Sequence, residues 1–146
     1  MSIENNRQTA DLPTRKQLER SIAHSFAKFY SQRLGCATPQ VICTIFANYV
    51  IIVADKATTP VEKLIKEIGQ INTLLEIRQK IDKILQPHLK KLIQEEIAVE
   101  IEDFICQLNL ESDRMFAIAN LKHEPKIRLK KSKTKNRDRS PIKNSV

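Results

Sequence analysis

Apolar residues at helical spacing mark the first structured segment of the chain. Between Leu18 and Tyr30 they recur at intervals of three and four residues, which is typical of an amphipathic helix. Thr14 precedes this segment and is a residue type that caps helix N-termini, while Gly35 follows it where a C-terminal cap is expected. The pattern therefore predicts a helix between Thr14 and Gly35, after a disordered leader of residues 1–13.

Two short apolar segments come next, at residues 41–46 and 49–54, and both are rich in β-branched and aromatic residues. They are separated by Ala47 and Asn48, so we expect a hairpin in which Asn48 takes the left-handed turn conformation. Side chains on both faces of these strands are apolar or nearly so, and both faces therefore need cover. We expect helices to cover one face and a second copy of the chain to cover the other.

A specific helix start follows the hairpin. Thr59 is expected as the N-cap, Pro60 as the first helical residue and Glu62 as the partner that closes a capping box. Apolar residues then continue at helical spacing for longer than a compact domain usually holds in one straight helix. Gly69 and Pro87 interrupt this run, and because both residue types disfavour a helix interior, we expect a break or kink near each.

The periodicity changes again near Val99, where apolar residues begin to alternate with polar ones. Residues 111–114 have the composition of a turn and precede another apolar segment, so the pattern predicts a second hairpin. A helical interpretation of residues 95–106 stays open, because Glu and Ile also suit helices. The predicted fold class is α+β: an antiparallel sheet of about four strands, formed by two hairpins and packed against helices, over residues 14–121.

The basic excess of the chain is confined to its end. Residues 1–121 contain 15 Lys and Arg against 15 Asp and Glu, whereas residues 122–146 contain 10 against 2, which accounts for the net charge of +8. Residues 122–146 also have too few large apolar side chains to form a core, so we predict a disordered basic tail. The residues expected to bind a partner or an anionic surface are Lys126, Arg128, Lys130, Lys131, Lys133, Lys135, Arg137 and Arg139.

Three functions remain open for this tail. It would dock the protein to a partner or to an anionic membrane surface, bind nucleic acid without reading its sequence, or only increase solubility. Residues 122–146 contain no aromatic side chain, which removes base stacking, the usual means of holding single strands.

The sequence contains no recognisable catalytic motif. Two glycines in the whole chain do not make a glycine-rich phosphate loop, and no nucleophile motif is present. The three histidines lie far apart without Cys or carboxylate at ligand spacing, and the three cysteines lack CxxC spacing, so we expect reduced thiols. Five acidic residues are interpreted as a solvated face rather than as carboxylates with raised pKa values: Glu95, Glu96, Glu100, Glu102 and Asp103. We predict no catalytic, cofactor-binding or metal site and no enzymatic activity.

The sequence contains no signal for export or for membrane insertion. The first residues are polar throughout, unlike a secretory signal. The longest apolar stretch, residues 41–54, is interrupted by Thr44 and Asn48 and is shorter than the roughly 20 residues that a spanning helix needs. We expect a cytoplasmic protein, peripheral to the membrane if its partner is a membrane complex.

The order of these elements resembles that of MpsC-type proteins, the family named for a component of a sodium-translocating, membrane-potential-generating system. The resemblance covers roughly residues 15–121 and departs from the family pattern after Gly35, where this chain has Cys36, Ala37 and Thr38 before its proline. The matching positions are Phe29, Tyr30 and Gly35, the hairpin at 41–53, Thr59-Pro60-Val61-Glu62-Lys63, Pro87, and residues 99–121.

The resemblance implies the same fold and a function without catalysis. It suggests a cytosolic interaction module that acts as an accessory component of a membrane-bound sodium- or ion-translocating complex. The alternative is a small nucleic-acid-associated regulator that uses the basic tail. The expected partners are another protein, in the form of a membrane complex, and a second copy of the chain in a homodimer; no cofactor is expected.

Overall fold

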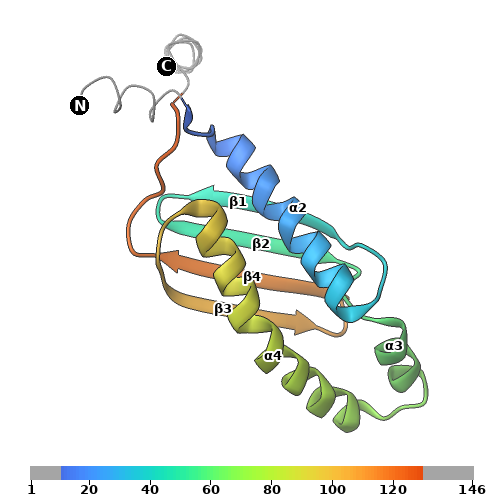
Figure 1. Cartoon of the computed structure of the whole chain (residues 1–146). Helices are drawn as coiled ribbons and strands as arrows, with labels where there is room; N and C mark the ends of the chain where they lie inside the picture. Colours follow the sequence, from blue (N-terminus) through green and yellow to red (C-terminus); the bar gives the residue numbers. More distant parts are fainter. Residues whose placement is uncertain (1–10, 130–146) are drawn as a thin grey trace, which may run out of the picture. The chain divides into compact units, whose positions relative to one another are not determined.

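The computed structural model of the chain describes residues 11–129. The chain divides into two compact units, of which Leu18–Pro125 contains the sheet. The other unit combines Met1–Gln17 with Lys126–Val146, and in its described part the backbone N–H of Arg128 donates to the carbonyl of Pro13 at 2.8 Å. The elements shown in Figure 1 are α2 (Arg15–Leu34), β1 (Gln40–Phe46), β2 (Tyr49–Asp55), α3 (Pro60–Glu67), α4 (Ile71–Ile97), β3 (Ile101–Asn109) and β4 (Arg114–Leu121).

The four strands form one antiparallel sheet in the order β1-β2-β4-β3. The two sequence hairpins, β1-β2 and β3-β4, are joined through the pairing of β2 with β4, so β1 and β3 are the edge strands. The predicted α+β fold class, with two hairpins packed against helices, is confirmed.

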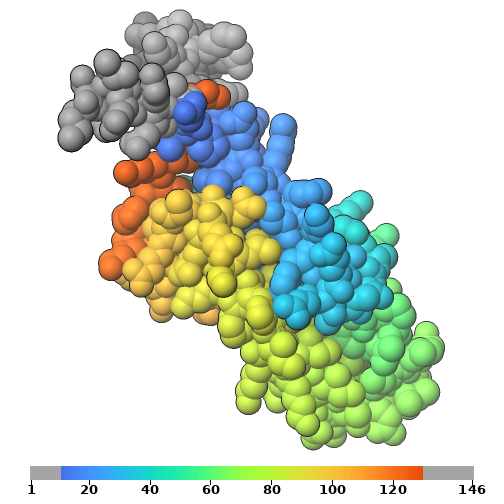
Figure 2. All heavy atoms as spheres, viewed as in Figure 1, coloured from blue at the N-terminus to red at the C-terminus, as the bar shows by residue number. Residues whose placement is uncertain are grey.

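Helices cover one face of this sheet. In Figure 1, α2 and α4 both cross the same face, and the space-filling view of that side in Figure 2 shows their side chains closed over the strands. Strand β2 alternates accordingly: Val50, Ile52 and Ala54 are fully buried beneath the helices, whereas Ile51 is 39% exposed. A strand whose side chains alternate between two faces can bury only one set when a single layer of helices is present.

The helix ends follow the expected local chemistry. Thr14 caps α2, since its hydroxyl accepts a hydrogen bond from the backbone N–H of Gln17 at 3.2 Å. Gly35 follows the last residue of α2 with φ of 61°, a left-handed conformation that glycine adopts without a steric penalty. Both predicted boundaries of this helix are confirmed.

The first hairpin turns at Ala47 and Asn48 as predicted, but the prediction of which residue is left-handed was wrong. Ala47 has the positive φ, of 52°. Asn48 instead forms hydrogen bonds with β4. Its side-chain amide donates to the side-chain carbonyl of Asn120 at 2.9 Å, and its backbone carbonyl accepts from the N–H of Leu121 at 2.7 Å. The Asn side chain is thus used to bond the neighbouring strand β4 rather than to relieve backbone strain.

Of the two positions at which a break or kink was predicted, one is a break. Gly69, with φ of 78°, lies between the end of α3 at Glu67 and the start of α4. Pro87 does not end the helix, and α4 continues through it. Leu85 and Leu89 on either side are buried in the core, and the carbonyl that Pro87 leaves without an intrahelical donor belongs to the exposed Lys83, where water can replace the donor.

The second hairpin is confirmed, and the helical alternative for residues 95–106 holds only for its first three residues. Helix α4 ends at Ile97, Ala98 caps it in the left-handed conformation, and β3 begins at Ile101 with a bulge between Ile101 and Asp103. Pairing with β4 stabilises the extended conformation of the nine residues of β3. This stabilisation outweighs the helix propensity of Glu and Ile.

The alternation of β2 predicts opposite results for neighbouring substitutions. Ile52→Lys places an unpaired ammonium in the core, so we expect the domain to lose more than about 3 kcal/mol of stability or to fail to fold. Ile51→Lys adds a charge to the exposed face and is expected to change the free energy of unfolding of the monomer, measured in dilute solution, by less than about 1 kcal/mol. Urea denaturation followed by circular dichroism measures both, and equal losses would contradict the assignment of faces.

The end of the chain supplies a second prediction. Deleting residues 130–146, which contain few large apolar residues, is expected to lower the thermal midpoint by only a few degrees, or about 1 kcal/mol or less. Deleting residues 122–146 should cost more, because the N–H of Lys122 donates to the carbonyl of Glu100 at 2.9 Å and Pro125 is buried. Calorimetry of both truncations tests this, and a molten 1–129 fragment would contradict it.

Candidate functional site

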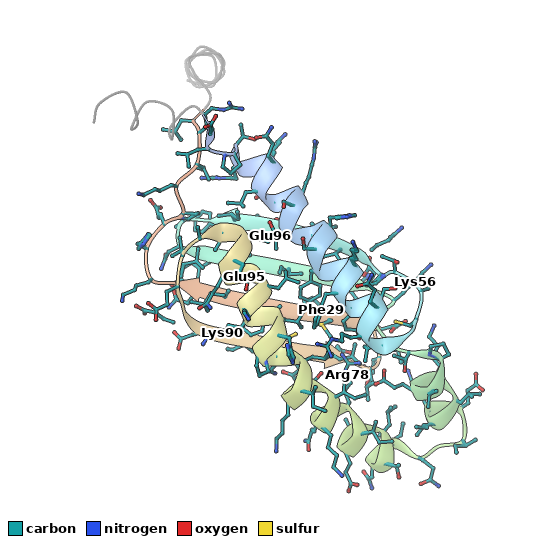
Figure 3. The ribbon with its side chains drawn as sticks, viewed as in Figure 1. Phe29, Lys56, Arg78, Lys90, Glu95 and Glu96 are labelled. Carbon is teal, nitrogen blue, oxygen red and sulfur yellow. The ribbon has the colours of Figure 1, made fainter. Side chains whose placement is uncertain are left out.

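The most distinctive chemistry of the described residues is a buried ionic cluster where three helices meet. The guanidinium of Arg78, from α4, donates to both carboxylate oxygens of Glu62, from α3, at 3.2 and 3.4 Å. It also donates to the hydroxyl of Tyr30, near the end of α2, at 2.9 Å, and to Asp82 one turn further along α4 at 3.0 Å. Figure 3 labels Arg78 at this junction. Arg78 and Glu62 are 4% and 1% exposed, so the pair is held out of water.

Glu62 has two functions in this cluster. It closes the predicted capping box, because its carboxylate accepts from the N–H of Thr59 at 3.0 Å while the Thr59 hydroxyl accepts from the N–H of Glu62 at 3.3 Å. The same carboxylate is the counter-ion of Arg78. One side chain thus starts α3 and attaches it to α4.

The segment before α3 is fixed to the second hairpin. Asp113, in the β3-β4 turn, accepts hydrogen bonds from the N–H and the hydroxyl of Thr58 through its carboxylate, and its backbone carbonyl accepts from the N–H of Ala57 at 3.1 Å. Tyr30 donates its hydroxyl hydrogen to the carbonyl of Ala57. The polar groups of this region are therefore bound to one another, and the described residues contain no buried side-chain polar atom without a partner.

The electrostatics of the cluster keep Tyr30 protonated. Burial raises the pKa of Tyr30, and the nearby Arg78 offsets this only in part. Burial also raises the pKa of Asp82 above its ordinary value, again against the effect of Arg78. At neutral pH the tyrosine keeps its proton, and each guanidinium nitrogen of Arg78 has a hydrogen-bond partner, so the arrangement joins helices and shows no group poised to attack a substrate.

The three thiols are also in poorly reactive surroundings. All are free; Cys43 and Cys106 are buried, and burial raises the pKa of each to about 12. Cys36 is partly exposed, and burial raises its pKa as well. Since the thiolate is the reactive form, none of these cysteines has the lowered pKa of a catalytic nucleophile.

Helix α3 and its C-cap residue Ile68 present most of their apolar side chains outward. The one buried residue of α3 is Glu62, whereas Val61, Leu64 and Ile68 are 65%, 60% and 72% exposed. An amphipathic helix ordinarily buries its apolar stripe. Here the capping box and the ion pair to Arg78 set which side faces the body, and the apolar side is left in solvent. We call Val61, Leu64 and Ile68 the α3 ridge.

The sheet face opposite the helices is a second exposed apolar surface, which we call the outer sheet face. Cross-strand register places its side chains in rows, for example Thr44, Ile51, Ile118 and Ile105 across the four strands. Among the described residues no helix covers this face. Its apolar side chains, all exposed except the half-buried Val53, are Ile42, Phe46, Tyr49, Ile51, Val53, Ile105, Phe116 and Ile118.

Two hollows lie beside the edge strand β3. The larger, of about 560 Å³, is lined by Leu75 of α4 and by Ile105, Phe116 and Ile118 of the outer sheet face. The smaller, of about 360 Å³, is lined by Leu75 together with Arg78, Asp82 and the amide side chains of Gln79, Gln86 and Gln107. The larger hollow therefore extends the apolar surface from the outer sheet face to Leu75 of α4, whereas most of the residues that line the smaller hollow are polar.

Of the eight basic residues predicted as a binding array, the structure describes two. Lys126 and Arg128 are exposed, and the backbone of Arg128 pairs with that of Thr14 in a parallel bridge. The other six, Lys130, Lys131, Lys133, Lys135, Arg137 and Arg139, lie outside the described residues.

Four of the five acidic residues that the sequence grouped together have separate structural partners. Glu96 accepts from the hydroxyls of Ser21 and Ser25 and so bonds α4 to α2, between which Figure 3 labels it. Asp103 accepts from the amide of Asn120 at 3.1 Å. Glu95 and Glu100 lie near Lys91 and Lys122, in exposed pairs. Within residues 11–129 no group of His, Cys, Asp and Glu residues is arranged to hold a metal ion.

Comparison with known proteins identifies the class to which this fold and these surfaces belong. The family described as "Na+-translocating membrane potential-generating system (MpsC)" matches residues 14–123. The chain therefore belongs to the MpsC family. No curated protein and no solved structure matched it. Over the part of the chain that the structure describes, no helix is long and apolar enough to cross a membrane.

Sequence reasoning missed the ionic cluster, although it left a signal. Arg78 occupies a position of the apolar stripe of α4, between the buried Leu74 and Leu85. A charged residue at such a position indicates a buried counter-ion. Glu62 was recognised as a cap, but only the packing of α3 on α4 shows that it is also the counter-ion of Arg78.

The cluster predicts a large effect for removal of one partner. Arg78→Met leaves Glu62 as a buried carboxylate without its cation, so we expect a loss of about 3–5 kcal/mol in the free energy of unfolding. Adding Glu62→Gln removes the unpaired charge and should recover part of that loss. Urea denaturation at neutral pH measures each variant.

The matched control is Lys91→Met in the same helix, which removes an exposed pair with Glu95 whose Nζ–Oε1 distance is 3.9 Å. Its expected effect is within about 0.5 kcal/mol. If Arg78→Met is no more destabilising than this control, the buried pair does not hold α3 to α4.

Proposed function

We propose that this protein is a non-catalytic interaction protein that acts as an accessory component of a membrane-bound sodium-translocating, membrane-potential-generating system. It works on the cytoplasmic side, peripheral to the membrane, and recognises its partner through its folded domain. In this proposal it acts as a homodimer.

One observation carries this proposal: the family match runs from residue 14 to residue 123 and ends before most of the basic tail. The shared part is therefore the folded domain, with its buried ionic cluster and its exposed apolar surfaces. The system named in the family description is thus associated with the fold, and the basic tail is an addition to it.

The chemistry of the described residues supports a role in binding rather than in catalysis. The buried polar groups are bound to one another, and the buried thiols are held protonated. The exposed features are apolar, and exposed apolar surface on a small domain is typical of protein–protein contact.

The proposal predicts that docking survives removal of the tail. Full-length protein and the 1–129 fragment are both expected to co-sediment, at about 150 mM salt, with membranes that contain the sodium-translocating complex. Neither should co-sediment with matched membranes that lack the complex. The amount of protein in the membrane pellet, measured by immunoblot, is the readout.

Two outcomes would contradict this. If full-length protein sediments and the 1–129 fragment does not, the basic tail carries the docking. If neither sediments while full-length protein stays bound to duplex DNA at the same salt, the protein is better explained as a nucleic-acid-associated regulator. Such binding would weaken steeply with salt, by a slope near 0.9 per phosphate neutralised, and would not depend on base sequence.

A further inference from the structure

The outer sheet face is exposed and apolar, although the fold does not require apolar residues there. Its side chains point away from the helices, so polar residues at these positions would leave the core unchanged. We propose that a second copy of this chain covers the outer sheet face, so that two sheets pack face to face about a two-fold axis. This inference concerns the association of the chain with itself and does not depend on the membrane partner.

By composition, the residues outside the described part do not match this face. They are 1–10 and 130–146, and among them only Met1, Ile3, Ile142 and Val146 are large and apolar. Most of the others are charged or polar, and a strongly basic segment does not match an apolar face. The cover is therefore assigned to another molecule.

The size of the face suits a dimer. The strands contain seven to nine residues, and with a rise of about 3.3 Å per residue and a spacing of about 4.8 Å between strands, the face has a flat footprint of roughly 450 Å². Side chains make the accessible area larger than the footprint. Covering the face on two copies at once therefore removes about 1,000 Å² or more, which reaches the lower limit for a specific interface.

The pattern of the face suits pairing about a two-fold axis. Its middle rows are mostly apolar, and its charged groups lie at opposite ends of the strands: Asp103 at one end, and at the other Asp55 and Arg114, which pair with each other at 2.8 Å. A two-fold axis that lies between the sheets, perpendicular to the strands, brings the Arg114 end of one copy over the Asp103 end of the other, so that the two Asp103 carboxylates do not face each other. An apolar centre with a polar rim is the usual anatomy of such interfaces.

The test uses the full-length protein with two central substitutions. Ile51 and Ile118 are directly opposed on the central strands β2 and β4 and are 39% and 45% exposed. Light scattering of wild type at about 100 μM should give twice the mass of the chain, whereas Ile51→Lys/Ile118→Lys should give the monomer mass, with a dissociation constant raised at least about 100-fold. Ile84→Lys, at a 64% exposed position of α4, is the matched control and should leave the dimer intact.

Each other outcome overturns the proposal. A wild-type monomer at that concentration shows that no second copy binds. A dimer that survives in the double variant shows pairing through the edge strands β1 or β3 instead of the face. If circular dichroism shows that the double variant is unfolded, Ile105→Lys, at a 63% exposed position of the edge strand β3, replaces it with the same expectation. Since no membrane is present, failure here removes the homodimer from the proposed function but leaves the proposed docking to the membrane complex standing, and failure of docking leaves the dimer standing.

Discussion

The guanidinium of Arg78 determines how the helices of this protein are connected. Among the described residues, Arg78 and Glu62 are the buried charged pair, and the cost of taking both out of water is offset by their mutual attraction and by the hydrogen bonds that Arg78 donates to Tyr30 and Asp82. Helices α2, α3 and α4 each contribute a group to this one site. Because a buried charge is tolerated only with its partners in place, the cluster specifies a single arrangement of the three helices.

The exposure of the α3 ridge follows from the same interaction. A short helix that was attached by apolar packing would bury Val61, Leu64 and Ile68. Here the attachment is polar, through Glu62, and the apolar side chains remain available on the surface. The protein thereby keeps a hydrophobic surface without using it for its own stability, which is the arrangement expected of an interaction protein.

The sheet likewise leaves an apolar surface exposed, and this surface is larger than the α3 ridge. One layer of helices stabilises the inner face, and the outer face keeps its apolar side chains on all four strands. Membership of the MpsC family associates this domain with a sodium-translocating membrane system, and the match covers the domain rather than the basic tail. Fold, family and surface chemistry are thus consistent with the interaction protein that we propose.

The sequence alone determined most of the fold, because the decisive signals were local. The capping box at Thr59, the glycine after α2 and the alternation of the second hairpin each depend on neighbouring residues, and each was predicted correctly. The left-handed residue of the first turn was missed, since only the pairing of β2 with β4 gives Asn48 a partner in Asn120.

Tertiary structure determined what local patterns could not. Pro87 lies within α4 because packing of Leu85 and Leu89 holds the helix together across the missing hydrogen bond. The sequence showed that both faces of the first hairpin are apolar, but only the side on which α2 and α4 pack separates Ile52, in the core, from Ile51, on the surface. Likewise, Arg78 and Glu62 are sixteen residues apart, and their pairing required α3 and α4 to fold against each other. Contacts between distant segments depend on how the elements pack, and no local pattern contains that information.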